Sequence, residues 1–391
     1  YPALARCIRS APHSFFLGAV GPDYLFYYLR GPEREAFQAA AMVLHGRDGG
    51  NTLRPFVSTV EAYGGQFGFA VGAFLLGYLV HVVADAVFHP LVLYTVGKGE
   101  GRPQYEHHVF ESALDLYVLK RWGNEEGALS FLRKTGATHP WSTVRTLPTL
   151  RNTLSGSTTR PLPTTLKELT LGMTESGELS REEFLRLLGV VSFLGGPYSE
   201  KALEVCLRRY EILQGWFWSP LACMATRVLK ALNRNLAFLE ASCYQRRFYR
   251  YGEAFAPTLE YRHPVTGEWR KARIEDLVNE TVEKFLAYAP EVEKLFQMTV
   301  IEDRPPIRSG KQEASEMQGD RWTKGNAGHT VQVEGAGQPT GTVQAEILQS
   351  FRALQGPNLE TGIVGDRADR ILYTREEGLA GIFGPFGYRY R

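Results

Sequence analysis

The chain has 391 residues, enough for two domains or for one large domain with an extension. Apolar residues make up 44% of it, which supports a hydrophobic core, and the formal net charge is only +2. The net charge therefore excludes a protein that binds nucleic acid or anionic membranes through its overall charge. It does not exclude a local basic surface.

The first third of the sequence predicts helices separated by loops rich in Gly and Pro. Ala36–Leu44 is short and apolar, and Glu106–Trp122 is amphipathic. Phe67–Leu93 is long and carries small residues that permit close helix packing. The apolar stretch Phe67–Val96 is the one transmembrane candidate, but its second half holds polar side chains, which are costly inside a bilayer. We therefore expect a buried helix and no transmembrane segment.

The middle of the chain mixes short helices with polar connections over residues 125–200, and Leu150–Thr164 is expected to be a loop. Ser180, followed by two glutamates, is typical of a helix start. Glu200–Tyr249 predicts one long helical stretch that ends in the basic-aromatic run Arg246–Tyr251. Such a run can bind phosphate or single-stranded nucleic acid, but more often it is a helix end with snorkelling side chains.

The last part of the chain predicts a small hairpin over Tyr261–Trp269, with its turn at Thr266–Gly267, and a helix over Ile274–Met298. The stretch from about 304 to 342 is poor in apolar residues. We accordingly expect a helical domain over residues 1–300, a flexible linker over 301–345 and a C-terminal tail of unknown role over 346–391.

The chain holds four cysteines, whose spacings fit no zinc-ribbon pattern. We interpret them as reduced thiols, which favours a cytoplasmic location. Secretion stays open, because the sequence opens at Tyr1 rather than at a methionine and a leader could have been removed.

Three ligand-type residues recur at helical spacing inside the long apolar helix: His81, Asp85 and His89. Residues four apart share one face of a helix. Buried without partners, each polar group would cost about 2 kcal/mol or more, and a bound metal ion removes that penalty. A lone histidine in such a helix is more often a core residue, but three residues in this register favour metal binding.

A second pair, His107 and Glu111, repeats the spacing on the next helix. The alternative is a solvated helix start. His108 points elsewhere on the helix, although it could exchange roles with its neighbour. If both patterns bind metal, their ligand atoms should converge to within about 4 to 6 Å, as closely spaced metal sites require.

Three upstream residues are further candidate ligands, each with an ordinary alternative. Asp23 follows a proline in a Gly-rich loop and could be a turn aspartate. His45 precedes a glycine and could complement a helix dipole. His13 could be a surface histidine. Imidazole and carboxylate together are the ligands that zinc favours at catalytic sites.

In order, these residues resemble a known family, the zinc-dependent phospholipase C superfamily, which also holds the fungal single-strand-specific nucleases. The matching segments are FFLGAVGPD, GYLVHVVADAVFHP and HHVFE, and the resemblance covers roughly residues 10 to 125. It implies an all-α fold, a multi-helix zinc-dependent phospholipase C-like bundle, here with a low-order C-terminal extension.

The resemblance also implies a ligand set for two closely spaced Zn²⁺ ions. Family members use a third zinc, bound by the amino-terminal residue, a nearby histidine and the aspartate matching Asp85. Here the first residue is Tyr1 rather than Trp, and His13 is the only early histidine. The implied ligands are Asp23, His45, His81 and Asp85 for one ion, His89, His107 and Glu111 for the other, and His13 as the candidate for the third site.

The function expected from this resemblance is a zinc-dependent phosphodiester hydrolase of phospholipase C type. A two- or three-metal site would activate water, and Asp23 would orient or deprotonate that water. A phospholipid head group is favoured over nucleic acid, because a net charge near zero argues against a nonspecific nuclease. The alternative is a zinc-stabilised binding or scaffold protein without catalytic activity.

Overall fold

A computed structural model describes residues 1–28, 30–99, 101–122, 178–192, 197–217, 219–233, 237–300, 346, 349, 352–366, 371–386 and 388. Within these ranges the regular structure is helical apart from one two-stranded sheet. The fold is therefore all-α, as the sequence predicts. The expected loop at 150–164 and the expected linker at 301–345 lie outside the described residues.

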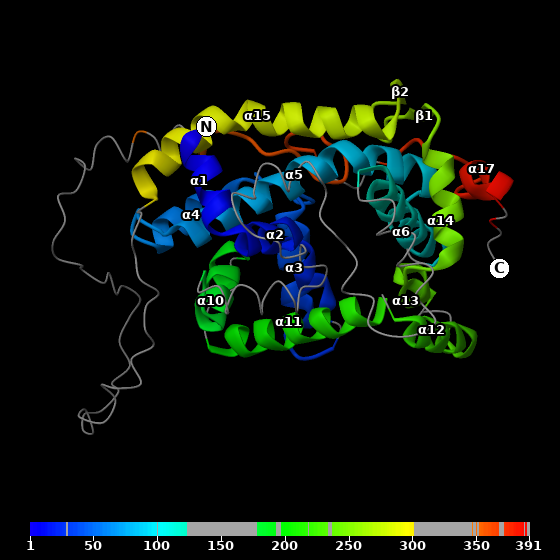
Figure 1. Ribbon diagram of the computed structural model, residues 1–391, viewed down its shortest axis with the longest axis horizontal. Coiled ribbons are helices and arrows are strands. Elements are labelled where there is room, and N and C mark those ends of the chain that lie inside the picture. The colour runs from blue at the N-terminus through cyan, green and yellow to red at the C-terminus, as the bar shows by residue number, and fades with distance from the viewer. Residues whose placement is uncertain are drawn as a thin grey trace.

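Helix α5 (Phe69–Val96) runs through the middle of the molecule, and the other helices surround it (Figure 1). Helices α1 (Pro2–Ser10), α2 (Pro12–Val20) and α15 (Ile274–Thr299) pack against it. The remaining elements are η1 (Asp23–Tyr27), α3 (Arg34–Leu44), α4 (Arg54–Ala62), α6 (Arg102–Trp122), α10 (Arg181–Val191), α11 (Pro197–Phe217), α12 (Pro220–Leu232), α13 (Ala237–Ser242), α14 (Arg246–Gly252), η4 (Glu253–Phe255), β1 (Leu259–Arg262), β2 (Trp269–Ala272), α17 (Ala380–Phe383) and η5 (Gly384–Phe386).

Among the described residues, α5 is the one helix long and apolar enough to cross a membrane. In the structure, however, 78% of its most apolar stretch is buried inside the protein. Phe74, Leu75 and Leu76 are fully buried among residues from α2, α4 and α10. A helix that is apolar on all sides is stable in a protein core as well as in a bilayer. The burial of α5 therefore agrees with the expected buried helix.

Glycines bring α2 unusually close to α5. A Cβ on Gly77 would lie 1.8 Å from the carbonyl oxygen of Phe15, and a Cβ on Gly18 would lie 1.9 Å from that of Phe74. No larger residue fits at either crossing without moving backbone. This contact brings the last turn of α2 next to the part of α5 that carries the candidate ligands.

The long helical stretch expected over 200–249 is wrong, because the chain breaks into four helices, α11 to α14. The first break lies at Ser219, whose side chain accepts a hydrogen bond from the Ala222 amide while Pro220 occupies the first turn of α12. Serine before proline is a typical helix start. In the basic-aromatic run, now α14, Arg247 pairs with the buried carboxylate of Glu240, which indicates a structural role for that arginine.

Two smaller expectations are confirmed. Ser180 caps α10 through a capping box with Glu183. The predicted hairpin is antiparallel, with Arg262 opposite Trp269 and with Gly267 in its turn at a φ of 73°. The hairpin begins two residues before the predicted segment, at Leu259, and ends three residues after it, at Ala272.

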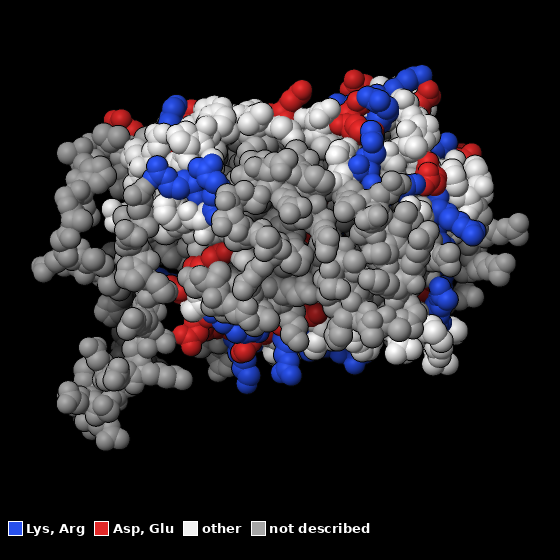
Figure 2. Space-filling model, viewed as in Figure 1, with Lys and Arg blue, Asp and Glu red and all other residues white. Residues whose placement is uncertain are grey.

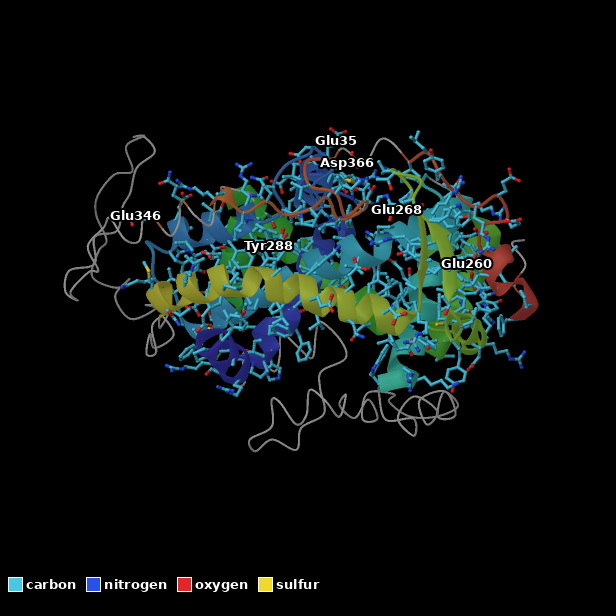
Figure 3. All side chains as sticks on the ribbon, turned by 90° about the horizontal axis from the view of Figure 1, so that it is seen from above. Glu35, Glu260, Glu268, Tyr288, Glu346 and Asp366 are labelled. Atoms are coloured by element: carbon cyan, nitrogen blue, oxygen red, sulfur yellow. The ribbon has the colours of Figure 1, made fainter. Side chains whose placement is uncertain are left out.

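The C-terminal segment folds back onto the helical body. Leu359 and Phe383 are fully buried, and the hydroxyl of Tyr288 on α15 donates to the carbonyl of Gln355 (Figure 3). The amide of Leu359 donates to the carbonyl of His45 at 3.0 Å. Residues from the stretch expected to be a tail therefore line the region of the candidate metal ligands.

Candidate metal centre

Two groups of ligand-type side chains gather along α5. Within each group, one ligand atom from every residue lies within 4.8 Å of the others. The residues of the first group come from η1, from the position directly after α3 and from α5. Those of the second group come from α5 and α6. The members are Asp23, His45 and His81 in the first group and His89, His107 and Glu111 in the second.

In the first group, Asp23 is the shared neighbour of two imidazoles. Its Oδ1 atom lies 3.1 Å from His45 Nε2 and 4.0 Å from His81 Nε2. The Oδ2 atom of Asp85 approaches His81 Nε2 from the other side, at 3.1 Å. Asp85 thus contacts His81 but lies outside the three-residue group, which draws on three elements.

In the second group, Glu111 is the shared neighbour. Its Oε1 atom lies 2.8 Å from His107 Nε2 and 3.7 Å from His89 Nε2. The expected convergence of the two helical patterns is confirmed by this contact between α5 and α6. Asp85 lies between the groups, because its Oδ2 atom is also 3.8 Å from His89 Nδ1.

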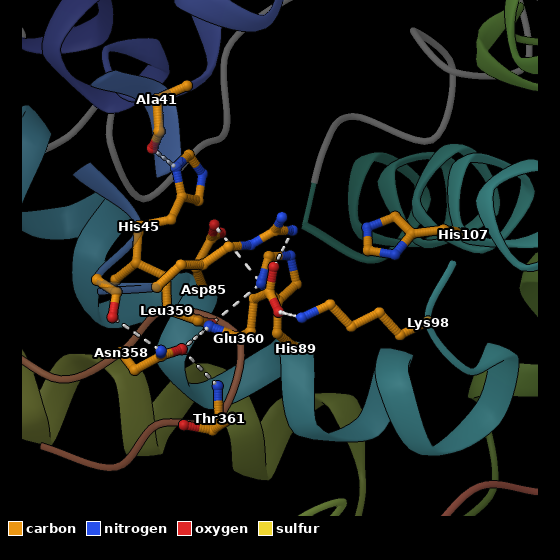
Figure 4. A network of polar contacts seen from close by, with 12 residues as sticks. Ala41, His45, Asp85, His89, Lys98, His107, Asn358, Leu359, Glu360 and Thr361 are labelled. Atoms are coloured by element: carbon orange, nitrogen blue, oxygen red, sulfur yellow. Dashed lines mark hydrogen bonds and ion pairs between the residues drawn. The ribbon is translucent and has the colours of Figure 1, made fainter. Parts of the chain in front are cut away.

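Three of the histidines are oriented by backbone carbonyl oxygens. A carbonyl can only accept, so each bond fixes the proton on Nδ1 and leaves the lone pair on Nε2, the atom that faces the group. Two of the pairs are His45 with Ala41 at 2.7 Å and His89 with Leu359 at 3.0 Å (Figure 4). The third is His81 with Ala19 at 2.9 Å.

The Nε2 atom of His81 is buried and makes no hydrogen bond with the described residues, although a carboxylate oxygen lies near it. An unsatisfied buried nitrogen is unfavourable, and a metal ion would satisfy it. Neutral imidazoles with free Nε2 atoms beside carboxylates are the donor set of catalytic zinc. The residues of both groups therefore fit the expected ions.

The electrostatics also fit a cation. Burial alone would lower the pKa of His81, but the carboxylates of Asp85 and Asp23 raise it to about 9. Burial likewise opposes the charge of His89, and Asp85 and Glu111 raise its pKa to about 10. The histidines in turn hold the pKa of Asp85 and of Glu111 below the ordinary range, against the effect of burial. The carboxylates thus attract positive charge, which divalent ions would supply.

The two groups open to solvent on their carboxylate side. The side chains of Asp23 and Glu111 are 41% and 40% exposed, whereas those of His45 and His81 are 6% and 7% exposed. Buried imidazoles hold the base of the site, and the acids lie where a substrate could reach them.

Two other histidines occupy different surroundings. The Nδ1 atom of His13 lies 2.7 Å from Glu178 Oε1, and His13 belongs to neither group. His108 lies 3.8 Å from Glu111 Oε2 and packs against Phe238. Burial lowers the pKa of His108 to about 4, so it stays neutral.

The C-terminal segment supplies residues that the sequence did not reveal. The backbone of Leu359 joins the two groups, because its amide bonds to His45 and its carbonyl to His89. Next to it, buried Glu360 pairs with Arg47 and with Lys98, whose side chain reaches it beside His89 (Figure 4). A backbone carbonyl leaves no signal in the sequence, so Leu359 could not have been found there.

These geometries agree with a comparison of the chain with known families. The family model described as zinc dependent phospholipase C matches residues 1–155, which include both groups. Residues 1–155 are therefore similar to the zinc-dependent phospholipase C family. No curated protein and no solved structure matches the chain.

Proposed function

We propose that the protein is a zinc-dependent phosphodiester hydrolase and that the two side-chain groups each hold one Zn²⁺ ion. The observation that carries the proposal is the orientation of His45, His81 and His89, whose Nδ1 atoms are all tied to backbone carbonyls. Metal-binding histidines are commonly held this way. The Nε2 atoms of all three therefore face the carboxylates of the two groups, which is where metal-binding nitrogens would have to point.

The ligand assignment follows the contacts. Asp23, His45, His81 and Asp85 would hold the first ion, and His89, His107 and Glu111 the second. Asp85 is the carboxylate that approaches a histidine of each group, His81 at 3.1 Å and His89 at 3.8 Å. His13, which pairs with Glu178, stays the candidate for a third site.

The residues around the two groups would bind the ions and position the water that attacks the phosphodiester. Zinc bound in such a site lowers the pKa of water toward neutrality and offsets phosphate charge. Asp23, with 41% of its side chain exposed, can orient that water or accept its proton at the open side. The buried imidazoles keep the ligand positions fixed while substrate enters and product leaves.

The charge of the site suits an anionic ester. Three carboxylates and four neutral imidazoles contribute three negative charges, so two divalent ions would leave a net positive site. The family match supports a phospholipid as the substrate. The small net charge of the whole chain offers little of the electrostatic affinity on which a nonspecific nuclease relies.

The test is release of phosphorylated head group from phosphatidylcholine, with single-stranded DNA as the competing substrate. The purified chain should be active with zinc, lose activity with a chelator and regain it when zinc is restored. Asp23→Asn should lower kcat by about 10²-fold or more while Glu260→Gln, an exposed acid on the hairpin, stays active. Zinc-loaded protein that cleaves neither substrate would contradict the proposal and favour a zinc-stabilised scaffold.

A further inference from the structure

Helix α12 presents an apolar face to solvent. Leu221, Met224, Val228 and Leu232 are 78%, 62%, 60% and 79% exposed. Their spacings of three, four and four residues place them along one side of the helix. A surface helix of a soluble protein normally turns polar residues outward, and a contiguous apolar stripe marks an interaction site.

The apolar surface continues onto the end of the preceding helix. Ile212 and Trp216 on α11 are 49% and 43% exposed, and α11 packs against α12. Tryptophan favours the boundary between water and lipid, because its ring is apolar and its N–H is polar. We call these six exposed apolar residues of two neighbouring helices the α12 face: Ile212, Trp216, Leu221, Met224, Val228 and Leu232.

The opposite side of α12 is firmly packed. Cys223 and Thr226 are buried, and Cys223 belongs to a small core with Phe217, Leu239 and Cys243. The exposed residues are therefore held outward by a fixed helix. Their exposure is a property of the folded chain.

Positive charge flanks the α12 face. The sequence contains no Asp or Glu between Glu211 and Glu240. Arg227 is exposed on α12 beside the apolar residues, and its guanidinium also donates to Gln245 at 2.8 Å. Lys230 lies on the packed side of the helix, where it pairs with buried Glu240. Figure 2 shows uncharged atoms at the corner where Figure 1 places α12, with Lys or Arg side chains beside them.

The α12 face lies close to the second metal group. Helix α12 packs on α13, and α13 packs on α6, which carries His107 and Glu111. Phe238 on α13 is 6.1 Å from the ring of His108. Helices α12 and α13 thus lie between the α12 face and the second metal group.

We propose that the α12 face docks on the surface of a phospholipid bilayer that contains anionic lipids. An apolar helix face with an arginine beside it and no acidic residue on the same helix is the pattern of an interfacial membrane-binding helix. A second copy of the chain fits less well, because two such faces would bring like charges together. The choice of a lipid surface rests on the proposed function, since a phospholipid hydrolase must reach substrate in a membrane.

The test is co-sedimentation of the zinc-loaded full chain with vesicles. We compare phosphatidylcholine vesicles with vesicles that also contain phosphatidylserine. The wild type should bind both and bind the anionic vesicles more tightly. The double variant Met224→Gln/Val228→Gln should bind at least about tenfold more weakly, because polar groups replace buried apolar area.

The matched control is Val282→Gln/Leu286→Gln on α15, where the two residues are 51% and 45% exposed and lie on the opposite side of the molecule from α12 (Figure 1). It should bind vesicles like the wild type. Both variants should melt within a few degrees of the wild type, since they change exposed side chains only.

Failure here is distinguishable from failure of the proposed function. Binding is read as sedimented protein, and head group released into the supernatant is measured alongside so that vesicle hydrolysis is accounted for. Wild-type hydrolysis of a soluble short-chain phosphodiester is measured separately. Equal vesicle binding by the α12 variant and the wild type would overturn the proposal. So would a wild-type dimer that ignores vesicles and dissociates in the α12 variant, which would assign the face to a second copy of the chain.

Discussion

A single methyl group at Gly77 should weaken both the fold and the metal centre. The added Cβ would lie 1.8 Å from the Phe15 carbonyl oxygen and 2.7 Å from the Ala19 amide nitrogen, both backbone atoms of α2. Restoring an ordinary contact of 3.4 Å requires α2 to retreat by about 1.6 Å. The Ala19 carbonyl accepts from His81 Nδ1 at 2.9 Å, so this movement would break the bond that orients His81.

The expected magnitude has two parts. Forced overpacking of a core contact destabilises a protein by about 1–3 kcal/mol. Loss of a hydrogen bond behind a metal-binding histidine typically weakens metal affinity by about 10- to 100-fold. The first part should appear in the metal-free protein, and the second should appear as weaker zinc binding.

The assay is urea unfolding of Gly77→Ala in chelator, together with zinc affinity measured by chelator competition. The control is Gly68→Ala, just before the same helix, where an added Cβ meets nothing within 4 Å. Gly68→Ala should resemble the wild type in both measurements. If Gly77→Ala also matched the wild type in both, the account of how α2 positions His81 would be refuted.

Three further predictions concern the carboxylates. Asp85→Asn should lose more zinc than Glu111→Gln in elemental analysis, because Asp85 approaches histidines of both groups and Glu111 those of one; equal losses would contradict this. Glu360→Gln should lower the Tm by several degrees, because the buried Glu360 carboxylate pairs with two cations and so holds the segment behind the metal centre. An unchanged Tm would count against that role. Burial opposes the charge of Glu240, but Arg247 and other partners lower its pKa in the folded state below the ordinary 4.5. Its stabilising effect is therefore complete above that value and disappears as the pH falls through the lower, folded-state pKa. The urea midpoint of the metal-free wild type should accordingly fall more steeply below pH 5 than that of Glu240→Gln.

The ligand spacing was readable because an α-helix repeats every 3.6 residues, so His81, Asp85 and His89 had to share a face. The same rule put His107 and Glu111 on one face of a second helix, and the metal hypothesis predicted that the two faces meet. Asp23 and His45 were upstream candidates with ordinary alternatives; the family resemblance favoured them as ligands, and the structure also brings them to the site. Helical periodicity thus carried most of the candidate site.

What the sequence did not show depends on backbone atoms and long-range packing. Leu359 is 270 residues from His89 along the chain, and its contribution is a carbonyl that any residue would have. The breaks in the stretch 200–249 had a local signal in Ser219 and Pro220, a cap followed by a proline, which the apolar periodicity obscured. The exposed side of α12 could not be separated from a core face by spacing alone.

The most direct test of the central claim is elemental analysis of the purified wild-type chain. The two side-chain groups predict two equivalents of zinc per chain. A chain that folds normally, is supplied with zinc and still retains none would contradict the metal centre and the hydrolase built on it.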